Sequence, residues 1–272
     1  MTDSEDGASI FNRWDTLRLS DESPYIWNVD TLCLYLQRVR GDIMLAQSND
    51  PPVVPPQNTW EPIGYLPLGM DWKRWALDAE TREIRIWPTF PDKPLVVKTR
   101  SPVVVPPEST IAFYMNQPIW IEVAVLRNGK YMTLDKLSPR KLSHTWYGDH
   151  FEGELCYAIK SRARRSVEDL TDEPLRAVCR FSIQNSSEEA LPVEKIRVKP
   201  EHFAVYKLRD QLWTNSIHVE FFGKDEPSHV KYENNVPETA KGATLVREPI
   251  KPYKSSSILD TVVFKSLLQP FQ

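Results

Sequence analysis

The fold is decided by residues 102–134, which read PVVVPPESTIAFYMNQPIWIEVAVLRNGKYMTL. Three runs rich in Val, Ile, Phe, Tyr and Trp are broken by prolines, by Asn116-Gln117 and by Asn128-Gly129. β-branched and aromatic residues favour strands, and Asn-Gly supplies the two positive-φ residues that a tight hairpin needs. The stretch therefore predicts a strand, a turn, a second strand, a hairpin and a third strand.

Similar runs recur on both sides of this stretch and predict an all-β protein with few, short helices. The 23 prolines against nine glycines favour stiff loops between strands over long helices. A hairpin is expected from residues 72–77 and 83–87. Further strands are expected at residues 31–39, 43–46, 60–68, 95–97, 103–105, 154–160, 176–185, 191–198, 203–208, 212–222 and 244–246.

A change of composition within residues 161–174 predicts a domain boundary, because clustered Arg there gives way to Asp, Glu and Pro. The two expected domains cover residues 24–163 and 174–272, and we expect both to be packed, immunoglobulin-like β-sandwiches. The second contains a strand, an Asn-Ser-Ser turn and a strand, a pattern common in such sandwiches. A single extended β assembly is the alternative, and residues 1–23 are expected to form a loose or edge-docked arm.

The bulk composition excludes some classes of function. Lys and Arg number 34 against 37 Asp and Glu, and the net charge of −3 argues against broad nucleic-acid binding. Cys33, Cys156 and Cys179 lie far apart in apolar runs, which predicts buried free thiols and a reducing compartment.

The start of the chain is acidic and polar, unlike a signal peptide, and no apolar run approaches the ~20 residues of a transmembrane segment. A cytoplasmic location without a transmembrane segment is therefore expected. The glycosylation sequon at Asn185-Ser186-Ser187 is then a chance match.

The densest group of metal-ligating residue types lies between His144 and Glu154. Imidazole and carboxylate groups bind zinc and related divalent ions, and a loop could bring His144, Asp149 and His150 to one centre. This interpretation predicts a metal-dependent hydrolase. The alternative is a polar turn with solvated charges, which is favoured because no known metal-binding spacing is present.

Three tryptophans raise a carbohydrate-binding hypothesis. Trp72, Trp75 and Trp87 fall on the hairpin expected at residues 72–87, and flat aromatic rings on a sandwich can stack on sugars. However, Trp72 and Trp75 have opposite strand parity and cannot share a face without a bulge. Tryptophans on β folds more often serve as core or interface anchors, and that interpretation is favoured.

Several blocks of the sequence resemble an uncharacterised prokaryotic family, domain of unknown function 432. The resemblance rests on residues 101–109, on residues 117–123, and on a block from Leu142 through Gly153-Glu154-Leu155-Cys156-Tyr157, and it covers the chain from about Leu95 onward. It implies a β-rich, cytoplasmic prokaryotic protein and assigns no catalytic residues. It draws attention to Trp146, Tyr147, Gly148 and Asp149, which lie in the third block.

These observations favour a non-catalytic protein-binding or scaffolding module that acts on another protein or on a second copy of itself. No cofactor is expected apart from the divalent metal of the hydrolase interpretation. Partner-binding candidates are Trp146, Tyr147, Asp149, Trp72 and Trp87. Residues 255–272 form an apolar tail, as a helix capped by Ser257 or as a strand, and such a tail can dock into a partner.

Overall fold

The computed structural model describes residues 14, 16–29, 32–48, 61–148, 150–151, 153–161, 163–170, 173, 175–223 and 228–253. The protein is all-β, as predicted. Within these residues the helical elements are two single-turn 3-10 helices, η2 (Pro200–His202) and η3 (Glu238–Ala240). No helix in this part of the chain is long and apolar enough to cross a membrane.

The chain divides into two compact units, and each is assembled from two separate segments. Unit 1 comprises residues 1–89 and 119–141, and unit 2 comprises residues 90–118 and 142–272. This division differs from the continuous domains expected from composition. Strands that precede residues 161–174 pair with strands that follow them.

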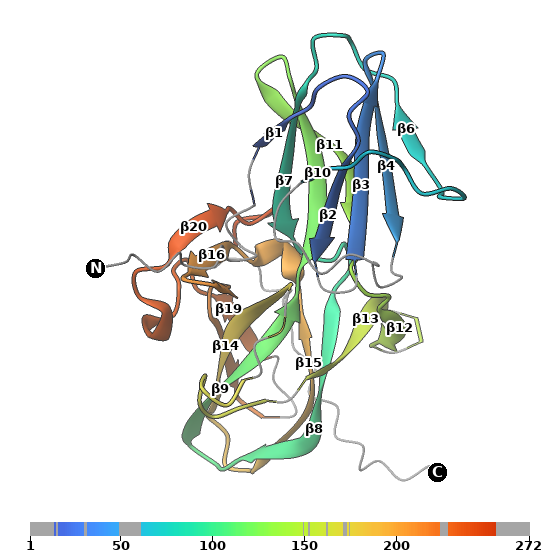
Figure 1. The fold of residues 1–272 in the computed structure, drawn as a ribbon. Coiled ribbons are helices and arrows are strands. Elements are labelled where there is room, and N and C mark those ends of the chain that lie inside the picture. Colours follow the sequence, from blue (N-terminus) through green and yellow to red (C-terminus); the bar gives the residue numbers. More distant parts are fainter. Residues whose placement is uncertain are drawn as a thin grey trace. The chain divides into compact units, whose positions relative to one another are not determined.

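Unit 1 contains two antiparallel sheets (Figure 1). In order across the first sheet the strands are β1 (Thr16–Arg18), β7 (Glu83–Thr89), β10 (Trp120–Arg127) and β11 (Lys130–Leu137). In order across the second they are β5 (Glu61–Pro62), β2 (Tyr25–Val29), β3 (Leu32–Val39), β4 (Asp42–Ser48) and β6 (Lys73–Trp75). Alternate side chains of both sheets are fully buried apolar groups, among them Leu34, Leu36, Ile84, Ile86 and Val123.

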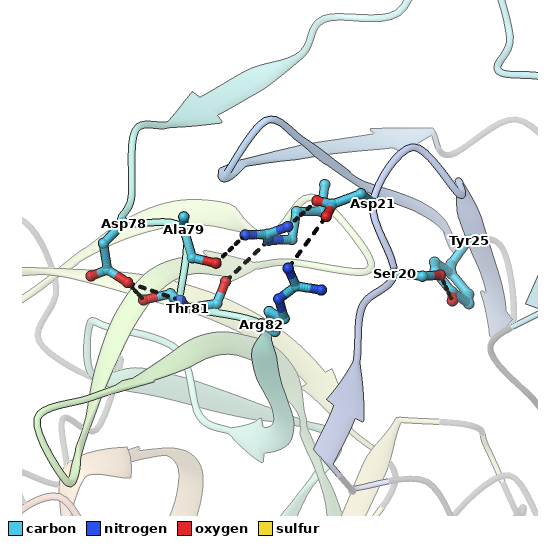
Figure 2. A network of polar contacts seen from close by, with 8 residues as sticks. Ser20, Asp21, Tyr25, Asp78, Ala79, Thr81 and Arg82 are labelled. Carbon is cyan, nitrogen blue, oxygen red and sulfur yellow. Dashed lines mark hydrogen bonds and ion pairs between the residues drawn. The ribbon is translucent and has the colours of Figure 1, made fainter.

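A buried arginine of β3, Arg38, holds the turn that precedes β7. The side chain of Arg38 is only 2% exposed, and its guanidinium donates to the backbone carbonyls of Ala79 (2.6 Å) and Thr81 (3.2 Å) and to the carboxylate of Asp21. Figure 2 shows Asp21, Ala79, Thr81 and Arg82 gathered at this point, with Arg82 3.5 Å from Asp21. The carbonyls of an irregular segment thereby receive donors inside the protein, where water cannot supply them.

Unit 2 also contains two sheets, and both mix parallel and antiparallel pairs. In order across one sheet the strands are β12 (Ser143–Tyr147), β13 (Glu154–Ser161), β8 (Leu95–Val105) and β15 (Leu191–Val198). In order across the other they are β19 (His229–Tyr232), β18 (Ile217–Phe221), β14 (Arg176–Asn185), β17 (Gln211–Trp213), β16 (Val205–Leu208) and β20 (Thr244–Arg247), with β9 (Ser109–Pro118) also paired to β14. The parallel pairs β8–β13 and β14–β18 depart from the antiparallel immunoglobulin arrangement.

Several local predictions are confirmed. The Asn128-Gly129 hairpin joins β10 to β11 with φ values of 50° and 72°. The three cysteines are buried, and each is a thiol rather than half of a disulfide.

Three other predictions are wrong. Asn116-Gln117 is not a turn, because β9 runs through it and pairs with β14. Residues 95–105 form one strand, β8, instead of two short strands. The register of its pairing with β15 shifts between Lys98 and Val103, a stretch that contains Pro102, which has no backbone N–H to donate. Residues 72–77 and 83–87 do not pair with each other, because β6 pairs with β4 and β7 pairs with β1 and β10.

Candidate functional site

The candidate site lies on the hairpin of β12 and β13 in unit 2. The two strands pair antiparallel from Ser143 opposite Ala158 to Tyr147 opposite Glu154. β13 pairs on its other side with β8, so β12 is the outermost strand of this sheet within the described part of the chain. An edge strand is a common place for another chain to attach.

Large apolar side chains are exposed at the end of this hairpin. Trp146 is 52% exposed and lies directly opposite Leu155, which is 45% exposed. Phe151, in the connection between the strands, is 98% exposed. We call these three residues the hairpin patch.

A polar group adjoins the hairpin patch on the same face of the sheet. His144 lies opposite Tyr157, two residues along each strand from the Trp146–Leu155 pair, and the two rings are 5.1 Å apart. The Tyr157 hydroxyl donates to Asp92 at 3.0 Å. The ammonium group of Lys93 lies 2.8 Å from Asp92 and 3.5 Å from the Tyr157 hydroxyl.

The ionisation states of this polar group are fixed by its own contacts. For Asp92, partial burial acts to raise the pKa, but hydrogen bonds from Lys93 and Tyr157 outweigh it and hold the pKa below its ordinary value. The hydrogen bond to Asp92 raises the pKa of Lys93. Burial, followed by the neighbouring Asp92, raises the pKa of Tyr157. At neutral pH the group is therefore a carboxylate, an ammonium and a protonated phenol.

The opposite face of the hairpin is held by an ion pair. Arg197 of β15 donates to the carboxylate of Glu154, and its guanidinium carbon lies 5.5 Å from the centre of the Tyr147 ring. The thiol of Cys156 is buried on this face. These contacts place Tyr147 on the face away from the hairpin patch.

Comparison with known protein families finds one that matches nearly the whole chain. A family model described as "Protein of unknown function (DUF432)" matches residues 13–265. The chain belongs to the DUF432 family. The match covers both units and therefore extends well before Leu95, where the resemblance in the sequence begins. No curated protein and no solved structure matches the chain.

The structure places the predicted metal ligands of this DUF432 member only in part. His144 lies on β12 and His150 in the following turn, and both are exposed, whereas Asp149 lies outside the described residues. Glu154, the neighbouring carboxylate, is engaged by Arg197. Among the described residues, no group of three or more His, Cys, Asp or Glu is arranged to hold a metal ion. The complete set of three ligands stays a prediction.

The three tryptophans of the carbohydrate hypothesis are not on one hairpin. Trp72 precedes β6 and Trp75 ends it, whereas Trp87 lies on β7 in the other sheet of unit 1. One face of the Trp87 ring is covered by the guanidinium of Arg85, 3.9 Å from the ring centre. A sugar could not stack on that face of Trp87 while Arg85 occupies it.

Sequence reasoning missed Asp92, Lys93, Leu155 and Arg197 as parts of the site. The alternation in residues 154–160 indicates the strand that carries Leu155. The segment with Asp92 and Lys93 and the strand with Arg197 reach the site through long-range pairing. β8, which follows Lys93, begins beside Tyr157, and β15 pairs with the other edge of β8. No local signal in the sequence encodes those pairings.

Proposed function

We propose that the protein is a non-catalytic protein-binding module whose contact surface is the hairpin patch. One observation carries the proposal: the Trp146–Leu155 pair and Phe151 leave three large apolar side chains exposed on a single hairpin. They are three of the nine large apolar side chains that are exposed in the described residues. Exposed apolar clusters bounded by polar groups are typical of interaction sites, and aromatic residues are enriched in them.

The partner that fits this surface is an extended protein segment with apolar side chains. A segment lying along the edge strand β12 could place alternate side chains on Trp146 and His144, which lie two residues apart on that strand, and one long side chain could reach across to Leu155. The rim formed by Asp92 and Lys93 offers a charged acceptor and a charged donor for the backbone of such a segment. Apolar anchors in the middle and paired polar groups at the rim are the usual division of roles in protein interfaces.

The same polar group supports a non-catalytic role. General acid–base catalysis is most efficient when the pKa lies near the working pH. Here the pKa of Asp92 is lowered and those of Lys93 and Tyr157 are raised, so each pKa lies further from neutral pH than its ordinary value. The three groups hold one another in fixed ionisation states and are suited to presenting a constant charge pattern.

Site-specific photo-crosslinking tests this proposal and can capture a partner of any identity. A photoreactive phenylalanine analogue replaces Phe151 in the full chain, and a control chain carries it at Leu245 on β20, which is 48% exposed. We expect defined crosslinked species from position 151, and we expect them to disappear when Trp146→Ala is added. Crosslinks that are the same from both positions, or that survive Trp146→Ala, would show that the hairpin patch is not the contact surface.

The proposed role of the apolar tail concerns residues 255–272, which lie outside the described residues. Removal of these residues from the chain carrying the crosslinker separates the two parts of the proposal. Loss of crosslinking at position 151 would indicate that the tail contributes to binding, whereas unchanged crosslinking would limit the contact to the hairpin patch. The metal-dependent hydrolase and the carbohydrate-binding sandwich stay as alternatives, tested by metal analysis of the purified protein and by Trp fluorescence with a glycan panel.

A further inference from the structure

A second surface with ligand-binding chemistry lies on unit 1, on one face of the sheet β1–β7–β10–β11. Ile84 and Ile86 of β7 are fully buried on one face, so Glu83, Arg85 and Trp87 lie on the other. Strand register places Arg85 between Thr16 of β1 and Ala124 of β10. Ala124 itself is fully buried, so the neighbouring side chains on this face pack over it.

Two aromatic rings hold the guanidinium of Arg85 in place. Its central carbon lies 3.9 Å from the centre of the Trp87 ring and 5.0 Å from the centre of the Tyr131 ring. The two rings lie 5.4 Å apart in an edge-to-face arrangement. The Tyr131 hydroxyl donates to Glu83 at 3.1 Å, which fixes the ring. Stacking restrains the plane of a guanidinium while its N–H groups stay available.

The acidic groups on this face have other partners. Glu83 accepts from Tyr131. Glu122, which is 4% exposed, accepts from Thr133 at 2.9 Å and lies 3.8 Å from Lys136. Within the described part of the chain, Arg85 makes its two ring contacts and no hydrogen bond or ion pair.

Counted over the described residues, the charge on this face is positive although the chain as a whole carries −3. Arg18 of β1 lies opposite Glu83 of β7 and faces the same side. The face therefore carries three cations, Arg18, Arg85 and Lys136, and two carboxylates, Glu83 and Glu122. Such an excess attracts anions.

We propose that Arg85, held by Trp87 and Tyr131, is the recognition point of an oxyanion-binding site on unit 1. A guanidinium can donate two parallel hydrogen bonds to two oxygens of one carboxylate or phosphate group. The aromatic rings set the orientation of the guanidinium toward such a group. The site is separate from the hairpin patch, so its test is independent of the proposed function.

Nuclear magnetic resonance of the full chain tests this site, with the Arg85 Nε–H and the Trp87 indole N–H signals followed. Inorganic phosphate and acetate are titrated separately, with sodium chloride as the control for ionic strength. We expect a saturable shift of both signals with half-saturation in the millimolar range, as for a single charge-assisted contact. The anion that binds more tightly identifies the source of the oxyanion.

Substitutions separate geometry from charge. Arg85→Lys keeps the cation but loses the planar fork, and we expect it to weaken the shift of the Trp87 signal about fivefold or more. Lys130→Gln removes an exposed cation from the β10–β11 turn of the same sheet and should leave the titration unchanged. A linear, chloride-like response of Arg85, or equal titrations for wild type and Arg85→Lys, would overturn the proposal.

Discussion

The side-chain amide of Asn185 lies 3.1 Å from the carbonyl oxygen of Val105, a residue 80 positions earlier in the chain. The same nitrogen lies 3.1 Å from the Pro106 carbonyl and 2.7 Å from the Glu189 carbonyl. The amide oxygen accepts from the backbone and the hydroxyl of Ser187. One buried amide thus joins the corner after β8 to the corner after β14 in unit 2. Because this side chain is completely buried, the folded protein has no room for a glycan on Asn185.

Asn185→Ala should therefore destabilise unit 2 strongly. The substitution leaves buried carbonyls without a donor, and we expect a loss of roughly 2–3 kcal/mol in the free energy of unfolding. Urea denaturation measures this loss. Glu188→Ala, an exposed change in the same turn, should cost less than about 0.5 kcal/mol. Equal effects of the two substitutions would contradict the assigned role of Asn185.

The network around Arg38 predicts an order of effects in unit 1. Arg38→Leu leaves the Ala79 and Thr81 carbonyls without their donor and should cost about 2–4 kcal/mol. Asp21→Asn should cost less than about 1 kcal/mol, because the Asp21 side chain is 46% exposed. Hydrogen exchange of β3 and β7 reports the local loss of stability. The reverse order would show that the ion pair, not the carbonyl contacts, holds the turn.

The Asn128-Gly129 hairpin shows what sequence alone could supply. Turn chemistry is local, so two residues that tolerate positive φ identify the turn directly. Asn116-Gln117 has a similar turn-like composition but lies in a strand, because its pairing with β14 outweighs the local preference. The candidate site was only partly predictable for the same reason, because local sequence does not encode long-range pairing. Trp146 lies in a recognisable block, whereas Asp92 and Lys93 join it through the parallel pairing of β8 with β13.

A glycine substitution tests the Asn128-Gly129 turn between β10 and β11. Gly129 has a φ of 72°, so Gly129→Ala should cost about 1 kcal/mol because an L-residue is strained there. Gly64→Ala is the matched control, since no atom lies within 4 Å of the added methyl group and φ is not positive. We expect little change in the urea midpoint for the control. A loss for Gly64→Ala as large as that for Gly129→Ala would indicate that backbone strain is not the cause.

Thiol reactivity should report global unfolding. Burial raises the pKa of Cys179 to about 12 and that of Cys156 to about 11, from an ordinary value of 9.0. The folded state keeps these protons, so ionisation of the unfolded chain disfavours folding as pH rises above about 9. At pH 8 we expect no rapid reaction of the native protein with a thiol reagent and three reactive thiols in denaturant. A rapidly reacting thiol in the native state would contradict this burial.

The hairpin patch is tested most directly by calorimetric titration of the segment captured at position 151 into wild type, Trp146→Ala and Leu245→Ala. Loss of a central aromatic anchor should weaken binding at least about tenfold, which corresponds to about 1.4 kcal/mol. The Leu245→Ala control should bind within about twofold of wild type, because Leu245 lies on β20 in the other sheet of unit 2. The proposed function predicts this difference between the two variants. Equal affinity of Trp146→Ala and wild type would contradict it.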